Sequence, residues 1–372
     1  MIKSVYVAAT SQHVGKTTST LGLVAALRQT GVRVGYCKPV GQEFLDLGNL
    51  RVDKDALLFS KVMDFQLASE IHSPVILGKG ATTAYLDDPS QFDYRERILR
   101  ASKILQEQND LVIYEGTGHP GVGSVVDLSN ADVAKLVGAG VIIIVEGGIG
   151  NTIDRLSLCL SKFNEKDVPV LGVIINKVVP EKVDKVRYYL SKKLNQMNIH
   201  LLGILPYDRT LSHPIMATIN EAVQGRVLAN EERLDNQVED YISGSLVDNE
   251  KLLTSENLLL VVSYKRMAEA MEKIQTITEE RGLEMSPLSG IIITGDGRHV
   301  MPVEEVPVIN NYVEKHQIPI ITTPLDTLGS VIKISHIEVK INTRTPWKAA
   351  RAIELIRENV NLNAILESSL VR

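Results

Sequence analysis

The strongest constraint on the fold lies near the start of the chain. An apolar run over residues 4–9 leads into a loop of small and polar residues, 10–14, and then into Gly15-Lys16-Thr17-Thr18. The apolar stretch 21–27 follows. This order predicts a strand, a tight loop and a helix, which is the context of a phosphate-binding loop. The usual pattern opens with glycine five residues before Gly15, where this chain has Thr10.

The chemistry of such a loop assigns roles to its residues. Backbone N–H groups of the loop and the start of the helix present positive charge to a phosphate. We expect Lys16 to reach the β- and γ-phosphates and the Thr17 hydroxyl to bind Mg²⁺. A surface lysine in an ordinary strand–turn–helix is the alternative. The predicted nucleotide-binding residues of the loop are Thr10, His13, Val14, Gly15, Lys16, Thr17 and Thr18.

Composition and charge disfavour several classes of protein. A chain of 372 residues is long enough for two domains. A net charge of -5 without a dense Lys/Arg tract argues against nucleic-acid binding. No apolar run approaches the roughly 20 residues that a membrane span requires, and we expect no secretory signal. The two cysteines, Cys37 and Cys159, are typical of reduced thiols in a cytoplasmic protein.

Apolar runs alternate with helical patterns over residues 1–210, which we expect to form one domain. Several runs are rich in β-branched residues and do not alternate with polar ones, as in strands that are covered on both faces. The repeated order of strand and helix predicts an α/β fold with a doubly wound, mostly parallel sheet. The expected strands cover residues 4–9, 32–37, 110–114, 139–145, 170–175 and 201–207.

The pattern breaks near residues 208–214, and we expect a second, smaller α/β domain over residues 211–360. It contains no phosphate-binding loop, and we interpret the polar turn 296–299 as structural. Residues 361–372 are expected to form a C-terminal tail. The expected strands are 258–263, 290–295 and 318–323, and the expected helices are 265–281, 306–316, 326–334 and 345–359.

Lys38 comes directly after the second predicted strand. Open α/β sheets bind ligands at the carboxyl ends of their strands, so Lys38 is placed to give the phosphates a second cation. A solvated lysine is the alternative. Its neighbour Cys37 is either a reactive thiol or, as we favour, a buried strand cysteine.

Carboxylates also occupy positions suited to Mg²⁺. Asp53 and Asp55 open a predicted helix, where they either complement the helix dipole or ligate the metal. The sequence does not decide between the two aspartates. Glu115 ends the strand 110–114, the position of a Walker-B-type carboxylate that holds Mg²⁺ or its water.

Three further stretches are of interest around these ends. The glycines within residues 116–123 leave room for a ligand, and His119 among them is a general base, an anion contact or neither. Asn176-Lys177 ends the fifth strand, where many phosphate-loop proteins contact the nucleotide base. Residues 72–92 are expected to form a long loop of the kind that covers a site.

Residues 1 to about 210 resemble the dethiobiotin synthetase branch of P-loop proteins. The matching stretches are Thr10–Thr17, Lys38-Pro39-Val40, Asp55-Ala56, Glu115-Gly116 and Asn176. That branch also carries Thr at the first loop position. The resemblance implies that Lys16, Thr17 and Lys38 contact phosphates, that Asp55 and Glu115 bind Mg²⁺ with Thr17, and that Asn176, with Lys177 beside it, contacts adenine.

The resemblance departs on the side of the second substrate. The synthetase pattern has a hydroxyl residue and a glycine where this chain has Gln42 and Glu43. The residues of a possible substrate pocket are Gln42, Gly116, Thr117, Gly118 and His119.

Nearly the whole chain is similar to the N-terminal regulatory region of long bacterial phosphotransacetylases. In that region a synthetase-like domain precedes a DRTGG domain, whose layout is followed by residues 258–266, 292–296 and 318–328. The name-giving residues differ, since Tyr264-Lys265-Arg266 and Thr294-Gly295-Asp296 occupy those positions. The acetyltransferase domain is absent from this chain, so we do not expect that activity.

Two functions follow from these patterns. The first is an ATP- and Mg²⁺-binding regulator or slow ATPase, with a small metabolite as a possible effector. The second is an ATP-dependent ligase or carboxylase acting on a small carboxylate or amine, with Lys16, Lys38 and Glu115 as its catalytic residues. We expect a homodimer formed through the second domain, unless that domain packs only on its own chain.

Overall fold

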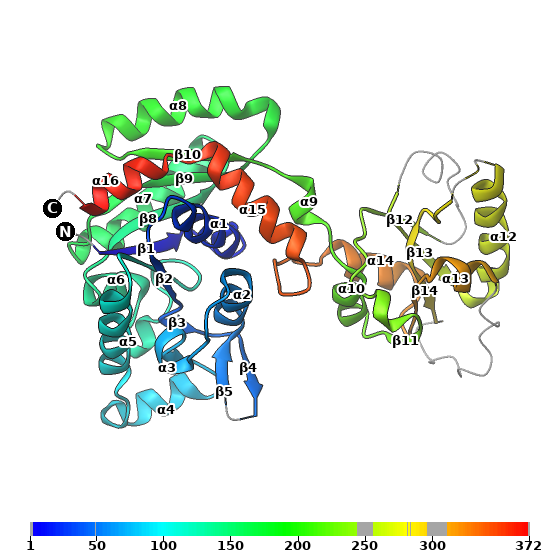
Figure 1. Ribbon diagram of the computed structural model, residues 1–372, viewed down its shortest axis with the longest axis horizontal. Coiled ribbons are helices and arrows are strands. Elements are labelled where there is room, and N and C mark those ends of the chain that lie inside the picture. The colour runs from blue at the N-terminus through cyan, green and yellow to red at the C-terminus, as the bar shows by residue number, and fades with distance from the viewer. Residues whose placement is uncertain are drawn as a thin grey trace. The chain divides into compact units, whose positions relative to one another are not determined.

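The chain forms two compact units in a computed structural model that describes residues 3–48, 50–243, 256–280, 282, 284–295 and 311–370 (Figure 1). The first unit comprises Met1–Asp208 and Ile341–Arg372, and the second comprises Arg209–Lys340. The first unit therefore takes both the start and the end of the chain.

A six-stranded parallel sheet forms the centre of the first unit. Its strands are β1 (Ser4–Ala9), β2 (Val34–Cys37), β7 (Leu111–Glu115), β8 (Gly140–Glu146), β9 (Val170–Val178) and β10 (Leu201–Pro206). Their order across the sheet is β10-β9-β8-β1-β7-β2. The chain adds strands on one side of β1 and then crosses to the other side, so the point where the order reverses lies at β1. This confirms the predicted doubly wound sheet.

Helices cover both faces of this sheet, as the apolar strands require. Val5 and Val7 of β1 pack in one core, while Tyr6 and Ala8 pack in the other, because successive strand residues point to opposite faces. The first core is covered by α1 (Lys16–Gln29), α2 (Lys54–Met63), α15 (Pro346–Asn359) and α16 (Leu362–Leu370). The second is covered by α5 (Tyr94–Gln108), α6 (Asn130–Leu136), α7 (Gly150–Glu165) and α8 (Val183–Gln196).

Small elements lie between β2 and α5. They are β3 (Val40–Gly41), β4 (Phe44–Leu47), β5 (Leu50–Asp53), α3 (Ser69–His72), β6 (Val75–Ile76), α4 (Ala81–Asp87) and the 3-10 turn η1 (Pro89–Gln91). The prediction of a long loop over residues 72–92 is therefore wrong. A helix as short as α4 spans too few turns to show a helical apolar period in the sequence.

The second unit is a smaller α/β domain, as predicted. Its sheet has the order β11-β15-β14-β13-β12, in which only β11 runs antiparallel to its neighbour. The strands are β11 (Arg226–Ala229), β12 (Asp240–Ser243), β13 (Leu258–Ser263), β14 (Leu288–Thr294) and β15 (Ile320–Thr323). The helices include α10 (Met216–Ala222), α12 (Tyr264–Glu280), α13 (Asn311–His316) and α14 (Thr327–Ser335). The turn 296–299 and the start of the predicted helix 306–316 lie outside the described residues.

The end of the chain corrects the predicted domain boundaries. Residues 345–359 do not belong to the second domain, because α15 packs on α1 in the first unit. Residues 361–370 are not a tail, because α16 contributes Ile365 to the same core. The backbone N–H of Asn361 also donates to Leu202 O of β10, at 2.8 Å. Amphipathic periodicity shows that a helix is half-buried, but it does not show against which sheet.

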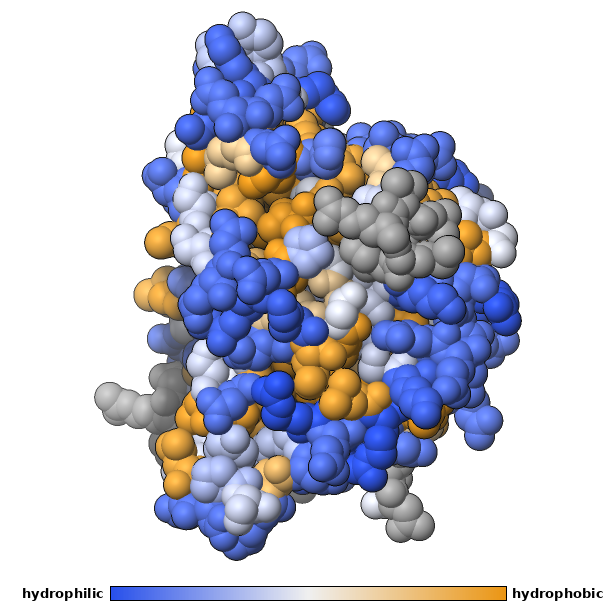
Figure 2. All heavy atoms as spheres, turned by 90° about the vertical axis from the view of Figure 1, so that its left-hand side faces the viewer, coloured by the Kyte–Doolittle hydropathy of each residue, from blue (hydrophilic) through white to orange (hydrophobic). Residues whose placement is uncertain are grey.

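Most of the molecular face drawn in Figure 2 is hydrophilic, with hydrophobic residues in patches between hydrophilic ones. Within the described part of the chain, no helix combines the length and the apolar character needed to cross a membrane.

The contact between α1 and α15 depends on a glycine. A Cβ atom at Gly22 would lie 2.5 Å from Ile356 Cγ1 and 2.7 Å from the Ala352 backbone oxygen. We expect Gly22→Ala to lower the free energy of unfolding by about 1–3 kcal/mol through overpacking. Gly150→Ala is the matched helical control, since a Cβ there meets nothing within 4 Å. Urea denaturation compares the two, and equal or higher stability of Gly22→Ala would contradict this account.

Candidate functional site

The predicted phosphate-binding loop connects β1 to α1. Its start is held to the sheet by Thr10, whose N–H donates to Ile144 O at 3.1 Å. Gly15 precedes α1 with a φ of 87°, in the left-handed region that favours glycine. A Cβ at Gly15 would clash with the Asn176 side-chain amide. Both backbone conformation and space therefore require glycine where the motif has it.

Asn176 and Lys177 of β9 brace this loop from the side. Asn176 Nδ2 donates to Val14 O at 2.8 Å, and Lys177 Nζ donates to His13 O at 2.5 Å. Lys177 Nζ also lies 3.6 Å from the Glu146 carboxylate. The pair thus holds loop carbonyls in place, so that the backbone N–H groups of the loop keep their direction. A contact between Asn176 or Lys177 and a nucleotide base stays a prediction.

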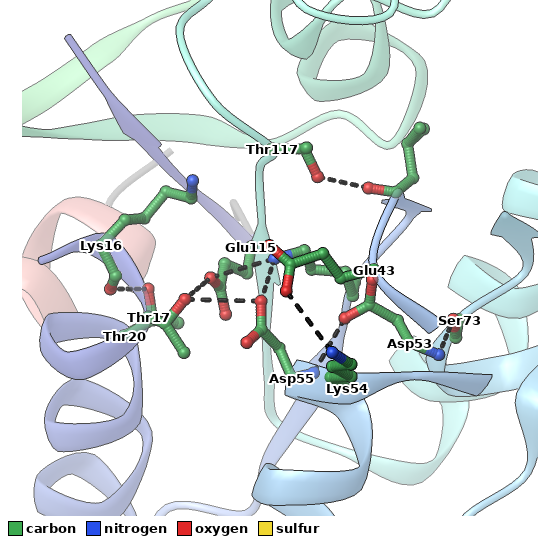
Figure 3. A network of polar contacts seen from close by, with 12 residues as sticks. Lys16, Thr17, Thr20, Glu43, Asp53, Lys54, Asp55, Ser73, Glu115 and Thr117 are labelled. Carbon is green, nitrogen blue, oxygen red and sulfur yellow. Dashed lines mark hydrogen bonds and ion pairs between the residues drawn. The ribbon is translucent and has the colours of Figure 1, made fainter. Parts of the chain in front are cut away.

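A charged cluster lies beside the start of α1 (Figure 3). Lys38 is only 5% exposed, and its ammonium forms ion pairs with Asp55 and with Glu115, the latter at 3.3 Å. The Thr17 hydroxyl donates to Glu115 at 2.6 Å and lies 3.4 Å from Asp55 Oδ2. The cluster joins α1, β2, α2 and β7, four segments that are far apart in the sequence.

Electrostatics keep Lys38 charged despite its burial. Burial by itself lowers the pKa of a lysine, but the nearby carboxylates of Asp55, Glu115 and Asp53 outweigh it and hold the pKa of Lys38 well above its usual value. The alternative of a solvated surface lysine at this position is therefore wrong. The buried ammonium in turn compensates the charge of Glu115, which is 0% exposed.

Tyr36 completes the surroundings of Glu115. Its hydroxyl donates to Glu115 Oε2 at 2.9 Å, and its ring stacks on Phe59 of α2 with centroids 3.6 Å apart. Burial raises the pKa of Tyr36, with a further increase from the Glu115 charge, so the hydroxyl remains a donor. Its role was not predicted, because an aromatic residue in an apolar strand gives no separate signal in the sequence.

The geometry separates the roles of the two aspartates. Asp53 caps α2, since its Oδ1 accepts from the Asp55 N–H at 2.9 Å, and its side chain packs against Gly41. Burial raises the pKa of Asp53 to about 7. Asp55 instead faces Lys38 and Thr17. Asp55, not Asp53, is thus the aspartate that lies beside the loop threonine.

Lys16 lies at the start of α1 and extends away from this cluster in Figure 3. Burial lowers the pKa of Lys16 to about 8, and the positive charge of Lys38 lowers it further. Among the described residues, no hydrogen bond or ion pair engages its ammonium. A lysine in this environment gains most from an anion, because an anion relieves both effects at once.

The glycine-rich segment after β7 is held by Asn130, a residue that the sequence prediction missed. Asn130 Oδ1 accepts from Tyr6 OH at 2.8 Å and from Thr117 N at 3.0 Å, while Nδ2 donates to Thr117 O and His119 O. The signal was present in the Ser129-x-x-Asp132 capping box, which starts α6 at Asn130.

The residues of the predicted substrate pocket do not all converge. The Thr117 hydroxyl donates to Val40 O, which ties the glycine-rich segment to the chain after Lys38 (Figure 3). Gly116 packs against Asn130 and Tyr6. Gln42 is exposed just after β3 and makes no hydrogen bond within the described ranges.

Gly118, His119 and Thr18 complete the predicted set. Gly118 has a φ of 59° and approaches Gln12 of the loop. His119 accepts a hydrogen bond on Nδ1 from Gly121 N at 3.2 Å. Thr18 lies in the first turn of α1, next to Thr17.

A pocket of about 360 Å³ opens on the other side of the loop. Its walls are the loop start, the segment after Gly118 and one side of α7. The lining residues are Thr10, His119, Pro120, Gly121, Arg155, Leu158, Cys159 and Lys162. Only His119 was among the predicted pocket residues, because residues of α7 carry no motif that would connect them to the loop.

The donor set around Thr17 suits a hard cation. Mg²⁺ takes oxygen ligands and is usually held by one or two carboxylates together with phosphate oxygens. Thr17, Asp55 and Glu115 supply one hydroxyl and two carboxylates in one place. In the described part of the chain, no group of three or more His, Cys, Asp and Glu residues is arranged to hold a metal by itself.

The strand order and the loop define a P-loop NTPase domain, and comparison with protein families agrees. Residues 3–215 match the family described as an AAA domain, AAA_26. The chain belongs to this family.

Curated relatives include phosphate acetyltransferases and ATP-dependent dethiobiotin synthetases. The phosphate acetyltransferase of Synechocystis is 22% identical over 375 residues, which cover 98% of this chain and 52% of the relative. That of Nitrosomonas europaea is 27% identical over 303 residues, or 78% of this chain and 41% of the relative. The ATP-dependent dethiobiotin synthetase of Methanocaldococcus jannaschii is 27% identical over 210 residues, or 54% of this chain and 92% of the relative. The chain thus spans about half the length of the acetyltransferases it matches.

The buried ion pairs of Lys38 predict an unequal response to two conservative substitutions. We expect Glu115→Gln to lower the free energy of unfolding by about 3 kcal/mol, because it weakens the compensation of a buried ammonium. Asp55 is 28% exposed, so Asp55→Asn should cost about 1 kcal/mol or less. Urea denaturation measures both, with the exposed Glu107→Gln as the control, expected within about 0.5 kcal/mol of wild type.

The double variant Lys38→Met/Glu115→Gln separates charge from packing. It removes both buried charges and should be more stable than Glu115→Gln alone. A double variant that is less stable than Glu115→Gln would show that the cluster acts through packing.

Proposed function

We propose that the first unit binds ATP with Mg²⁺ and that the protein is a nucleotide-dependent regulator or slow ATPase. One observation carries the proposal: Thr17, Lys38, Asp55 and Glu115 meet in one cluster at the start of α1, and Lys16 directly precedes Thr17 at the end of the loop. Phosphates require cations and helix N–H groups, while Mg²⁺ requires oxygen ligands, and both sets are present here.

Each residue has a defined task in this proposal. Lys16 neutralises phosphate oxygens, and its pKa rises when it does so. Thr17, Asp55 and Glu115 would hold Mg²⁺, which when bound supplies charge neutralisation on the phosphates. The Lys38 ammonium now compensates the two carboxylates. With a divalent ion held by these carboxylates, the Lys38 ammonium would no longer be needed to compensate their charge and would be available to the phosphates.

A second candidate function is ATP-dependent ligation or carboxylation of a small carboxylate or amine, with Lys16, Lys38 and Glu115 as catalytic residues. The pocket of about 360 Å³ that includes Thr10 favours it, since it gives a second substrate space beside the loop. Gln42 and Glu43 depart from the synthetase pattern, so the regulator remains the first proposal. We do not assign acetyl transfer to this chain, because it spans only about half the length of the phosphate acetyltransferases that it matches.

Lys16→Ala tests nucleotide binding directly. The substitution removes a charge-assisted contact worth about 1.5–3 kcal/mol, so we expect the affinity for ATP·Mg²⁺ to fall roughly tenfold or more. Isothermal calorimetry measures the dissociation constant. Lys192→Ala on the exposed side of α8 is the control and should bind as wild type does. Equal ATP affinity in Lys16→Ala and wild type would contradict the assignment of the loop.

We further propose that the second unit is a DRTGG-like domain that makes the protein a homodimer. The support is its size and its buried strands, together with the span of the match to the phosphate acetyltransferase of Synechocystis, which covers 98% of this chain. The described residues of this unit include no phosphate-binding loop and no metal-binding cluster; such a unit commonly serves binding, and symmetric pairing is the commonest outcome.

Light scattering tests this proposal on a designed deletion. A simple truncation after residue 210 would also remove α15 and α16 from the first unit. Residues 209–340 should therefore be replaced by a flexible linker. We expect a dimer for the full chain and a monomer for the deletion variant. A full chain that is monomeric at tens of micromolar, or a deletion variant that remains dimeric, would refute the assignment.

A further inference from the structure

Strand β9 contains an extra residue beside the phosphate-binding loop. Ile175 of β9 pairs with Ile204 of β10, and the following pair is Val178 with Pro206. Three steps along β9 therefore match two along β10, which is a β-bulge. The backbone at Lys177 has a φ of 58°, in the left-handed region that a lysine rarely adopts. Such strain is retained only where neighbouring contacts compensate it.

The contacts that compensate this strain come from the loop. Lys177 Nζ donates to His13 O, and Asn176 Nδ2 donates to Val14 O. Asn176 Oδ1 also accepts from the Lys177 N–H at 2.9 Å, which holds the bulge itself in shape. His13 has a φ of 61°, so both residues of the contact between Lys177 and His13 are strained. The bulge and the loop therefore stabilise each other.

The other side of the bulge leads to the first connection between the two units. Val178 O accepts from the Tyr207 N–H at 2.7 Å. The next residue, Asp208, is the last of the first unit before the chain enters the second. Because successive peptide groups of a strand point in opposite directions, loss of the bulge would turn Val178 O away from Tyr207. The backbone of Lys177 thus decides whether this hydrogen bond can form.

An ion pair joins this connection to the segment by which the chain returns. The chain re-enters the first unit at Ile341, and α15 follows. Arg351 Nε of α15 donates to Asp208 Oδ2 at 2.6 Å, and Arg351 Nη1 donates to Glu354 at 3.0 Å. The Asp208 side chain is only 13% exposed, so this pair is better shielded from water than a surface ion pair. The ion pair ties the two connections together.

We infer that the Lys177 bulge couples nucleotide binding at the loop to the two connections between the units. The inference rests on the proposed nucleotide site and adds how its occupancy reaches the rest of the chain. Lys177 has two arrangements. In the present one its backbone is left-handed and its amine is on His13 O. In the other its backbone is extended and its amine pairs only with Glu146, which lies 3.6 Å away.

A bound nucleotide favours the present arrangement. Its phosphates bind the loop N–H groups, whose direction depends on the loop carbonyls that β9 holds. A ligand shifts an equilibrium toward the state that binds it more tightly, so the nucleotide stabilises the bulge. The bulge then keeps Tyr207 on Val178 O and Asp208 within reach of Arg351. Coupling of this kind is reciprocal, so loss of the ion pair between Asp208 and Arg351 must weaken nucleotide binding.

Hydrogen exchange of the full chain with and without ATP·Mg²⁺ tests the coupling at Tyr207. Exchange is read at times at which the Val173 amide, bonded to His200 O in the same strand pair, has not exchanged. We expect the Tyr207 amide to exchange at least about fivefold more slowly with ATP. Calorimetry on the same samples measures ATP binding. Binding without a change at Tyr207 would overturn the inference and leave the nucleotide site intact, whereas absence of binding would contradict the proposed function and the inference with it.

Lys177→Gly and Lys177→Ala separate backbone strain from the amine contact. Both remove the amine, but glycine adopts a φ of 58° freely and alanine does not. Without nucleotide, the Tyr207 amide should exchange about tenfold faster in the alanine variant than in the glycine variant. Asn198→Gly and Asn198→Ala are the matched controls, since Asn198 has a φ of 55° in the turn before β10, and they should not differ at Tyr207. Equal exchange in the two Lys177 variants would overturn the inference.

A double-mutant cycle tests whether Lys177 and Arg351 act through one connection. The hydrogen bonds of Arg351 go to Asp208 and Glu354 in the described part of the chain, yet Arg351→Ala should weaken ATP binding at least about fivefold. Arg357→Ala, exposed on the same helix, is the control and should match wild type. In Lys177→Ala, the further change Arg351→Ala should cost little more, because the connection is already broken. Wild-type affinity of Arg351→Ala, or effects that add in full, would overturn the inference.

Discussion

The arrangement of the first unit depends on a buried ammonium between two carboxylates. A lysine that is 5% exposed is costly unless it is paired, and Lys38 is paired with both Asp55 and Glu115. The ion pairs fix the ends of β2 and β7 and the start of α2 with respect to one another. Thr17 joins the same carboxylates, so the start of α1 is fixed with them. The charges that we assign to phosphate and metal binding therefore also position the loop.

The two sides of the loop show different chemistry. On one side the Lys38 cluster balances cations and carboxylates, as a site for a metal and a polyphosphate requires. On the other side, Arg155 and Lys162 line a pocket whose described lining residues carry no carboxylate, although Glu165 next to it pairs with Lys162. Asn176 and Lys177 hold the loop backbone between these two sides.

Much of the fold could be predicted because the strands are nearly continuous apolar runs. The runs 4–9 and 258–263 coincide with β1 and β13. Site residues at strand ends, such as Lys38 and Glu115, could be predicted to converge, since parallel strands end at one edge of the sheet. The packing partner of α15 could not be predicted, because periodicity identifies which face of a helix is buried but not which element it packs against. The position of Arg155 beside the loop was also not predicted, because only the three-dimensional structure shows that α7 lies next to Thr10.

The central claim is that Thr17, Asp55 and Glu115 hold the metal ion of a nucleotide site. When the metal and the nucleotide bind, the Lys38 ammonium leaves the two carboxylates. A crystal structure with Mn²⁺ and a non-hydrolysable ATP analogue tests it most directly. The account predicts an anomalous Mn²⁺ peak next to these three side chains, the triphosphate along residues 10–18, and a Lys38 ammonium that has moved from the carboxylates to the phosphates. A nucleotide bound elsewhere, or Lys38 still between Asp55 and Glu115 with Mn²⁺ at another place, would contradict it.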